Sequence, residues 1–375
     1  MKSGILTIFH QEGYSQGSLA MFYTRVVSAA VAAFYGCVAA ADCPLSIAVL
    51  DTADHVAYIT VTNTGSEPVT VFTGNTVLSE HQTRDVIVHD GSGDDLPFGG
   101  IYVNYRRTGL SASMFRTFQP GETVTRPVDV SGIYDLTGIL TANVAAVQSF
   151  RYIVGDDAPT ALAEMLSCPP TISNFRAITP NLRKLASRHV EARTRRASGI
   201  EIQKRDVAFS SCPSSNITAL KNSVGHAISM ATAAKTAAGS ETDYWLTWFK
   251  NAGQQTNTET IYGSIANIQT SGVTISCDQS QCPEDVYAYA SPSTKTIVPC
   301  SYYWDSPELA SNCAGDDSDR AGTMLHEMSH IFGTYDYAYG RDACLQLNAT
   351  SAANNADTYE MYADGVRLGG CKRRA

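Results

Sequence analysis

Two histidines, a glutamate and an aspartate lie within eleven residues near the end of this 375-residue chain. They are His326, Glu327, His330 and Asp336. Residues four apart on a helix share one face, so His326 and His330 can hold one metal ion. Glu327 points about 100° away and can reach a water on the open side of the metal. The spacing predicts a catalytic zinc site with His326, His330 and Asp336 as ligands and Glu327 as general base.

The chemistry expected of such a site is hydrolysis of a peptide bond. Zinc held by three protein ligands lowers the pKa of its bound water to about 7. Glu327 would accept a proton from that water as the water attacks a polarised amide carbonyl. An HExxH sequence also occurs by chance on amphipathic helices whose histidines are merely solvated. The glycine and the ligand-type aspartate that follow this one favour the metal site.

A helix must present these residues, and its ends are readable in the sequence. Apolar residues recur beside the histidines and would pack into a core: Met324, Leu325, Met328, Ile331 and Phe332. Candidate N-cap residues precede them: Asp316, Asp317, Ser318 and Asp319. Gly333 is a plausible stop, because glycine adopts the left-handed conformation at low cost. The chain can then turn back and bring Asp336 to the metal.

The motif HExxH followed by GTxDxxYG, over residues 326–340, resembles the deuterolysins, secreted fungal zinc endopeptidases of the aspzincin group or M35 family. The resemblance implies one zinc ion per catalytic domain, held by His326, His330 and Asp336, with Glu327 as base. It also implies that Tyr339 steadies the developing oxyanion, a role suited to a phenol donor.

A second segment, NADTYE at residues 355–360, is similar to a downstream family segment whose acidic residues line a substrate pocket in lysine-preferring relatives. On this resemblance Asp357 and Glu360 are substrate-binding candidates. Capping or surface roles are the alternative for both residues.

Two other functions remain open. The interval from His330 to Asp336 is shorter than in typical deuterolysins and equals that of metzincins with an aspartate ligand, for which Met361 could supply a Met-turn. The deuterolysin-like and metzincin-like peptidases share the same ligands and reaction, and the geometry of the loop after His330 would distinguish them. A non-catalytic secreted binding protein is the third function, but a structural zinc site does not need a general base such as Glu327.

Residues 1–41 are read as a signal peptide. A short segment ending in Arg25 precedes an apolar stretch at 26–38, and small residues at 39–41 fit a cleavage site. The polar residues before Met21 make Met21 a candidate for the true start. The apolar stretch is too short for a good membrane span, and we expect a secreted, extracellular protein with no membrane attachment after signal removal.

Residues 42–205 are expected to form a β-rich propeptide that assists folding and covers the cleft until processing. Short alternating runs separated by turn residues suggest a small β-sandwich. The runs lie at residues 56–61, 69–72, 86–88 and 101–103, and a turn at 118–124 leads into another strand.

The basic stretch that follows lacks the aromatic residues of a nucleic-acid site and is read as an accessible linker. Lys204 and Arg205 form a dibasic pair that a processing protease would cut, with Arg196 as the competing position. Residues 206–375 would then be the zinc metalloprotease domain. They carry 18 acidic and 10 basic residues, a charge that favours basic protein or peptide substrates.

The catalytic domain is expected to be a mainly helical monomer with a small antiparallel sheet, which makes the whole chain α+β. Helical patterns occur at 217–228, 244–249 and 261–268, and strand patterns at 273–277, 286–290 and 295–299.

Ten cysteines without a CxxC metal pattern indicate disulfides in an oxidising compartment. The family resemblance implies the pairs Cys212–Cys277, Cys282–Cys300 and Cys344–Cys371, which leaves Cys313 without a partner. A Cys43–Cys168 pair would close the propeptide. A Cys168 thiol that caps the zinc is the alternative.

Overall fold

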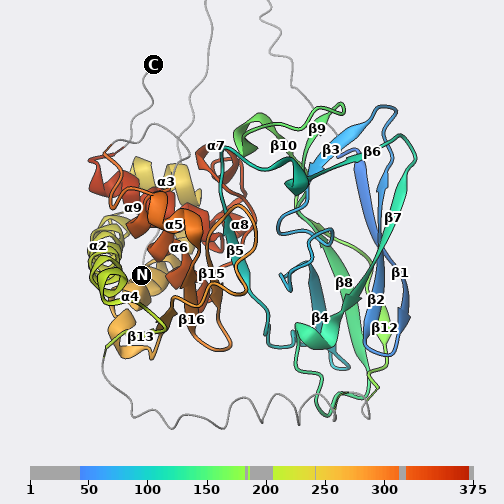
Figure 1. The fold of residues 1–375 in the computed structure, drawn as a ribbon, viewed down its shortest axis with the longest axis horizontal. Helices are drawn as coiled ribbons and strands as arrows, with labels where there is room; N and C mark the ends of the chain where they lie inside the picture. Colours follow the sequence, from blue (N-terminus) through green and yellow to red (C-terminus); the bar gives the residue numbers. More distant parts are fainter. Residues whose placement is uncertain (1–42, 182–184, 186–205, 241, 312–317, 371–375) are drawn as a thin grey trace, which may run out of the picture. The chain divides into compact units, whose positions relative to one another are not determined.

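The computed structural model describes residues 43–181, 185, 206–240, 242–311 and 318–370 (Figure 1). The expected signal peptide, Arg196 and the Lys204–Arg205 pair fall outside these ranges. Within them no helix is long and apolar enough to cross a membrane. The described chain combines helices and sheets, as the α+β class predicts.

Residues 43–181, called the β-rich part below, form strands and short turns. In β2 the alternation is clear, because Ala57, Ile59 and Val61 are fully buried and the residues between them are not. The strands form three sheets, ordered β1-β2-β7, β10-β9-β3-β6 and β11-β8-β12, with β4 also paired to β8. Their bounds are β1 Leu45–Ala53, β2 Val56–Asn63, β3 Val69–Phe72, β4 Val86–Asp90, β6 Phe115–Phe118, β7 Thr123–Asp129, β8 Ala142–Gln148, β9 Arg151–Val154, β10 Leu166–Ser167, β11 Thr171–Ile172 and β12 Arg176–Ile178.

In residues 206–370, the helical part, the predicted helices and strands occur in the predicted order, but a strand that was not predicted precedes the first helix. The helices are α2 Ser214–Ala238, α3 Asp243–Phe249, α4 Gln255–Ala266, α5 Ser301–Asp305, α6 Arg320–Ile331, α7 Arg341–Cys344, α8 Ala349–Ala353 and α9 Ala356–Arg367. The strands are β13 Ala208–Ser210, β14 Thr274–Ser276, β15 Val286–Ser291 and β16 Thr296–Pro299.

The small sheet of this part is mixed, so the antiparallel prediction is wrong for two of its pairings. Strands β13 and β14 run parallel, as do β14 and β16, whereas β15 and β16 are antiparallel. Parallel neighbours need a long crossover connection, and helices α2 to α4 supply it between β13 and β14.

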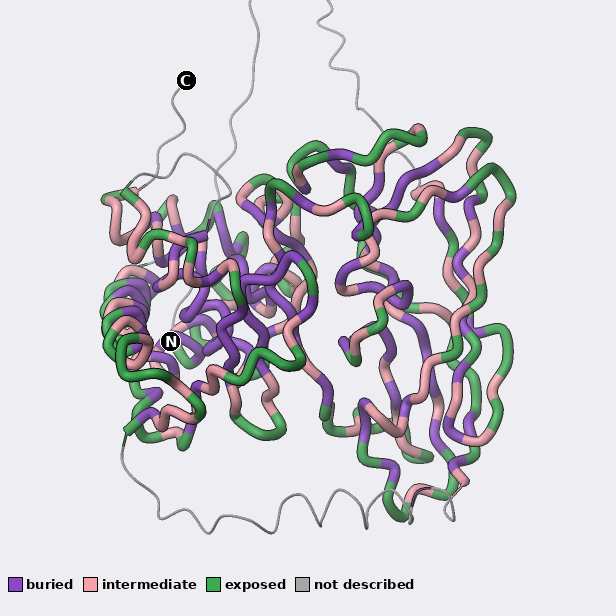
Figure 2. Tube along the Cα trace, viewed as in Figure 1, coloured by how far each residue is buried: buried purple, intermediate pink, exposed green. Residues whose placement is uncertain are grey.

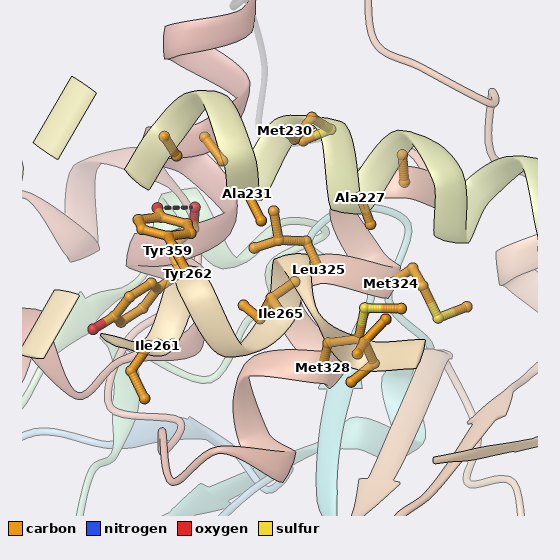
Figure 3. Packing of buried hydrophobic residues seen from close by; sticks show 14 of the residues in the cluster. Ala227, Met230, Ala231, Ile261, Tyr262, Ile265, Met324, Leu325, Met328 and Tyr359 are labelled. Carbon is orange, nitrogen blue, oxygen red and sulfur yellow. Dashed lines mark hydrogen bonds between the residues drawn. The ribbon is translucent and has the colours of Figure 1, made fainter. Parts of the chain in front are cut away.

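The helices pack around a core that supports the predicted metal-binding helix α6. Figure 3 shows side chains from α2 and α4 meeting Met324, Leu325 and Met328 of α6, all of them buried. The Tyr262 hydroxyl of α4 donates to the Tyr359 carbonyl of α9 over 2.7 Å. Helix α2 is buried along one side only, as its alternating colours show in Figure 2. Helix α6 is therefore fixed by neighbours from three other helices.

One strand of the β-rich part does not join its sheets. Strand β5, Tyr102–Tyr105, pairs antiparallel with β15 and becomes the edge strand of the sheet in the helical part (Figure 1). All four of its residues are buried. The prediction that this run belongs to a β-sandwich of the propeptide is thus wrong, because its backbone hydrogen bonds are made to β15.

Three disulfides lie within the described residues: Cys43–Cys168, Cys212–Cys277 and Cys282–Cys300. The bond to Cys43 occupies the sulfur of Cys168, so this residue does not act as a metal-capping thiol here. Cys344 is buried and forms no disulfide with another described residue. Cys313 and Cys371 lie outside the described residues, and the Cys344–Cys371 pair stays a prediction.

Candidate metal centre and active site

Helix α6 begins and ends where its sequence predicts. The Asp319 side chain caps the helix by accepting from the Gly322 amide, whereas Asp316 and Asp317 lie outside the described residues. The helix ends at Ile331, and Gly333 follows with φ +103°, a conformation that favours glycine. His326 and His330 project from adjacent turns, and their Nε2 atoms lie 3.1 Å apart.

The loop after α6 returns Asp336 to the two histidines. Asn355, just before α9, accepts hydrogen bonds from the amides of Tyr337 and Ala338 at 2.8 and 2.9 Å. The Tyr335 amide donates to the Asn354 carbonyl over 2.7 Å. These bonds place Asp336 Oδ1 3.3 Å from Nε2 of His326 and 3.3 Å from Nε2 of His330.

The three side chains fit a tetrahedral metal ion. Ligand atoms about 2.0 Å from a tetrahedral zinc would lie about 3.3 Å from one another, and the observed separations are 3.1, 3.3 and 3.3 Å. Both Asp336 oxygens are buried without a hydrogen-bond partner among the described residues. Burial would raise the pKa of Asp336, but the imidazoles of His330 and His326 lower it overall. A cation at this point would satisfy all three groups.

The other nitrogen of each imidazole faces an oxygen atom, as a hydrogen-bond pair at His330 and as a close ion-pair contact at His326. His330 Nδ1 lies 3.0 Å from the Thr334 carbonyl oxygen, and His326 Nδ1 lies 3.0 Å from Asp357 Oδ1. Protons on both Nδ1 atoms leave both Nε2 lone pairs for the metal, the arrangement usual in protein metal sites.

Glu327 lies beside the metal ligands, on the same helix, and is fully buried. Its carboxylate oxygens have no hydrogen-bond partner of ordinary geometry among the described residues. Burial raises the pKa of Glu327 well above its ordinary value, and the nearby Asn104 of β5 acts in the opposite direction. The position of this carboxyl group beside the metal ligands is the one that a general base for a metal-bound water would occupy.

Tyr339 contacts the β-rich part through its hydroxyl group, which donates to the Val103 carbonyl of β5 over 2.8 Å. The Asn75 amide also contacts this hydroxyl, and Arg151 binds the Tyr339 carbonyl. Burial raises the pKa of Tyr339 well above its ordinary value, so the hydroxyl keeps its proton and remains a donor. The donation to a peptide carbonyl is the kind of contact expected of an oxyanion-stabilising tyrosine.

Asp357 and Glu360, on the first turns of α9, are buried next to His326 and hold a basic side chain. Arg107 Nη2 lies 2.6 Å from Asp357 Oδ1 and 3.1 Å from Glu360 Oε2. Arg107 is 1% exposed. Burial alone would lower the pKa of Arg107, but the two carboxylates raise it, so the guanidinium is charged. Both carboxylates are therefore buried and paired with a cation, so the surface role is wrong for them, and a role in substrate binding stays a prediction.

Three residues at this site were missed in the sequence: Tyr102, Asn104 and Arg107. The Tyr102 ring stacks on the His330 ring at a centroid distance of 4.3 Å. One sequence feature could have drawn attention to Arg107: two arginines, Arg106 and Arg107, directly follow an alternating run. Met361, by contrast, lies within helix α9 and packs against the helical core, so it does not form a Met-turn.

Comparisons with known proteins identify similar peptidases. Residues 234–364 match a family model described as Aspzincin_M35, lysine-specific metallo-endopeptidase. A neutral protease 2 homolog of Arthroderma gypseum is 28% identical over 332 residues, 82% of this chain and 85% of the relative. A homolog from Sclerotinia sclerotiorum is 27% identical over 331 residues, 84% of this chain and 87% of the relative. A zinc peptidase from Grifola frondosa is 25% identical, with 41% of this chain and 97% of that chain covered and a TM-score of 0.36.

Proposed function

We propose that this chain, a deuterolysin-like metalloendopeptidase of the M35 family, is a secreted zymogen in which residues 42–205 hold the catalytic part inactive. Residues 1–41 would be the signal peptide, and residues 206–375 the mature enzyme released by a cut after Arg205. The observation that carries the function is the convergence of His326, His330 and Asp336 beside Glu327.

Each side chain has a separate task in the proposed reaction. A bound zinc ion would polarise the substrate carbonyl and lower the pKa of its water to about 7. Glu327 would accept the proton of that water and pass it to the leaving amine. Tyr339 would donate to the oxygen that becomes negative, as it donates to the Val103 carbonyl in the intact chain.

A preference for basic substrates is supported by the acidic pocket. Asp357 and Glu360 hold a guanidinium group without exposure to solvent, and a lysine or arginine side chain of a substrate would offer them the same charge. The excess of acidic residues after Asp206 would also attract basic polypeptides from a distance.

Latency is supported by the burial of the site. His326 and Glu327 have no exposed surface and His330 is 1% exposed, yet an endopeptidase must admit a peptide to these groups. The residues in contact with Tyr339, His330 and Asp357 come from the β-rich part. Removal of that part after processing would open the site.

The test is histone cleavage by the full-length chain before and after treatment with a dibasic-specific protease. We expect the processed protein to cleave histones and the unprocessed chain to leave them intact. A zinc chelator should abolish the cleavage. Glu327→Gln should lower the rate at least about a hundredfold while the bound zinc, measured by mass spectrometry, stays unchanged. Glu259→Gln, on helix α4, is the matched control. A Glu327→Gln protein that keeps most of its activity would exclude this residue as the base.

A further inference from the structure

We infer that residues 101–107 are a built-in peptide inhibitor that fills the substrate groove out of register, with Arg107 in the pocket for a basic side chain. This inference rests on the proposed function, because it assigns the groove to peptide substrates. It adds which segment blocks the groove, which side chain anchors the segment, and why the enzyme does not cleave it.

The backbone of the segment binds as an extended peptide would. Strand β5 pairs antiparallel with β15, which would be the edge strand of its sheet without β5, and places Val103 opposite Tyr289 and Tyr102 opposite Ala290. Addition of a strand to an exposed sheet edge is a common way to bind peptides, because the main-chain hydrogen bonds do not depend on sequence. The edge of β15 is therefore the surface on which substrates would lie once β5 leaves.

Side-chain and backbone groups of the segment lie next to the reacting groups one by one. Tyr102 stacks on the ligand His330, Asn104 lies near Glu327, and the Val103 carbonyl accepts from Tyr339. Arg107 then bonds the two acidic residues of α9. A single stretch of seven residues thus covers a metal ligand, the base, the oxyanion donor and the acidic pocket.

The register explains why this segment blocks the site and stays intact. The pocket carboxylates lie 3.0 and 3.3 Å from Nδ1 of the ligand His326, so the pocket is adjacent to the reacting centre. A substrate that fills the pocket would place a neighbouring peptide bond there. In this chain the carbonyl at Tyr339 belongs to Val103, four residues before Arg107.

The segment is also tied down beyond the groove. Asp285, just before β15, accepts from the Ser111 amide at 2.6 Å and lies 3.4 Å from the Arg106 guanidinium. The Arg107 carbonyl accepts from the Leu162 amide at 2.8 Å. These contacts hold the backbone on both sides of Arg107, so the strand cannot easily slide into a cleavable register.

The experiment compares four full-length proteins: wild type, Arg107→Ala, Arg107→Lys and the control Arg116→Ala. Arg116 pairs with Glu122 on the surface of the β-rich part. Hydrolysis of a lysine-containing fluorogenic peptide is measured while the chain is intact, verified by mass spectrometry, and again after dibasic processing. Loss of one partner of a buried ion pair weakens binding at least about thirtyfold. We expect at least that rise in activity for intact Arg107→Ala, little for Arg107→Lys and none for Arg116→Ala.

A second measurement does not depend on the folding of the variants. A synthetic peptide of residues 98–109 should inhibit processed wild-type enzyme, and the same peptide with alanine at position 107 should bind at least about thirtyfold more weakly. Equal inhibition by both peptides would overturn the inference. So would an intact Arg107→Ala chain that is folded but has no more activity than the intact wild type. Failure of the processed wild type to cleave any lysine-containing peptide would instead refute the proposed function.

Discussion

Replacement of Asp357 by asparagine tests whether one carboxylate supports both the metal ligand and the substrate pocket. Asp357 Oδ1 lies 3.0 Å from His326 Nδ1, and Oδ2 accepts from the Gly340 amide at 2.6 Å. Both neighbours are donors, whereas asparagine offers one acceptor oxygen and one donor nitrogen. The variant must therefore place an NH₂ group against one of two N–H groups, and it also loses the negative charge.

The expected loss can be estimated from these contacts. Removal of a group that orients a metal-binding histidine lowers metal affinity about 10- to 100-fold, which corresponds to about 1.4 to 2.7 kcal/mol. Glu360 Oε2 lies 3.3 Å from the same His326 nitrogen and can replace part of the lost contact. We therefore expect Asp357→Asn to fall near the lower end of that range.

The assay is competition for zinc between the processed protein and a fluorescent chelator. Asp278→Asn, a change of the same kind at an exposed position, is the control. At saturating zinc, Asp357→Asn should recover its rate on a peptide with neutral side chains more fully than on a lysine-containing peptide. A zinc affinity within threefold of wild type would refute the role of Asp357 in orienting His326.

Two further predictions concern Tyr339 and Asp85, a buried acid of the β-rich part. Tyr339→Phe removes the donor to the reacting carbonyl, so kcat of the processed enzyme should fall about a hundredfold with KM little changed; a loss confined to KM would contradict this role. Burial raises the pKa of Asp85 from 3.8 to about 7, and the bond from Thr83 opposes this only in part. The folded state then binds its proton more tightly than the unfolded state, so stability falls by about 4 kcal/mol as pH rises from about 4 to about 7. Asp85→Asn should raise Tm at pH 8 and leave it nearly unchanged at pH 4, and equal effects at both pH values would contradict the shifted pKa.

The metal site could be predicted from sequence because local geometry determines most of it. His326 and His330 are four residues apart on a helix whose cap and stop are also local signals, so their meeting needs no tertiary information. Asp336 follows within one short loop. The acidic residues Asp357 and Glu360 were found through family resemblance, since nothing in their own spacing brings them to His326.

Strand β5 could not be assigned from sequence for a physical reason. An alternating run such as residues 101–105 indicates a strand with two faces, but its pattern does not identify the partner strand. The pairing with β15 joins residues nearly two hundred positions apart. The role of Arg107 could not be predicted for a similar reason. An arginine beyond a strand end is ordinarily solvated, and the two carboxylates that bind Arg107 lie far along the chain, on α9.

The described disulfides also limit how long the enzyme stays latent after processing. Cys43–Cys168 closes within the β-rich part, and the other two bonds close within the helical part. Until the proposed cut after Arg205, the blocking strand and its groove share one chain, and their effective concentration is on the order of millimolar. After the cut, no disulfide among the described residues joins them, and blocking becomes an ordinary bimolecular equilibrium. Dilution would then activate the enzyme. The processed molecules would remain inhibited at high concentration and would begin to cleave substrates as their concentration falls.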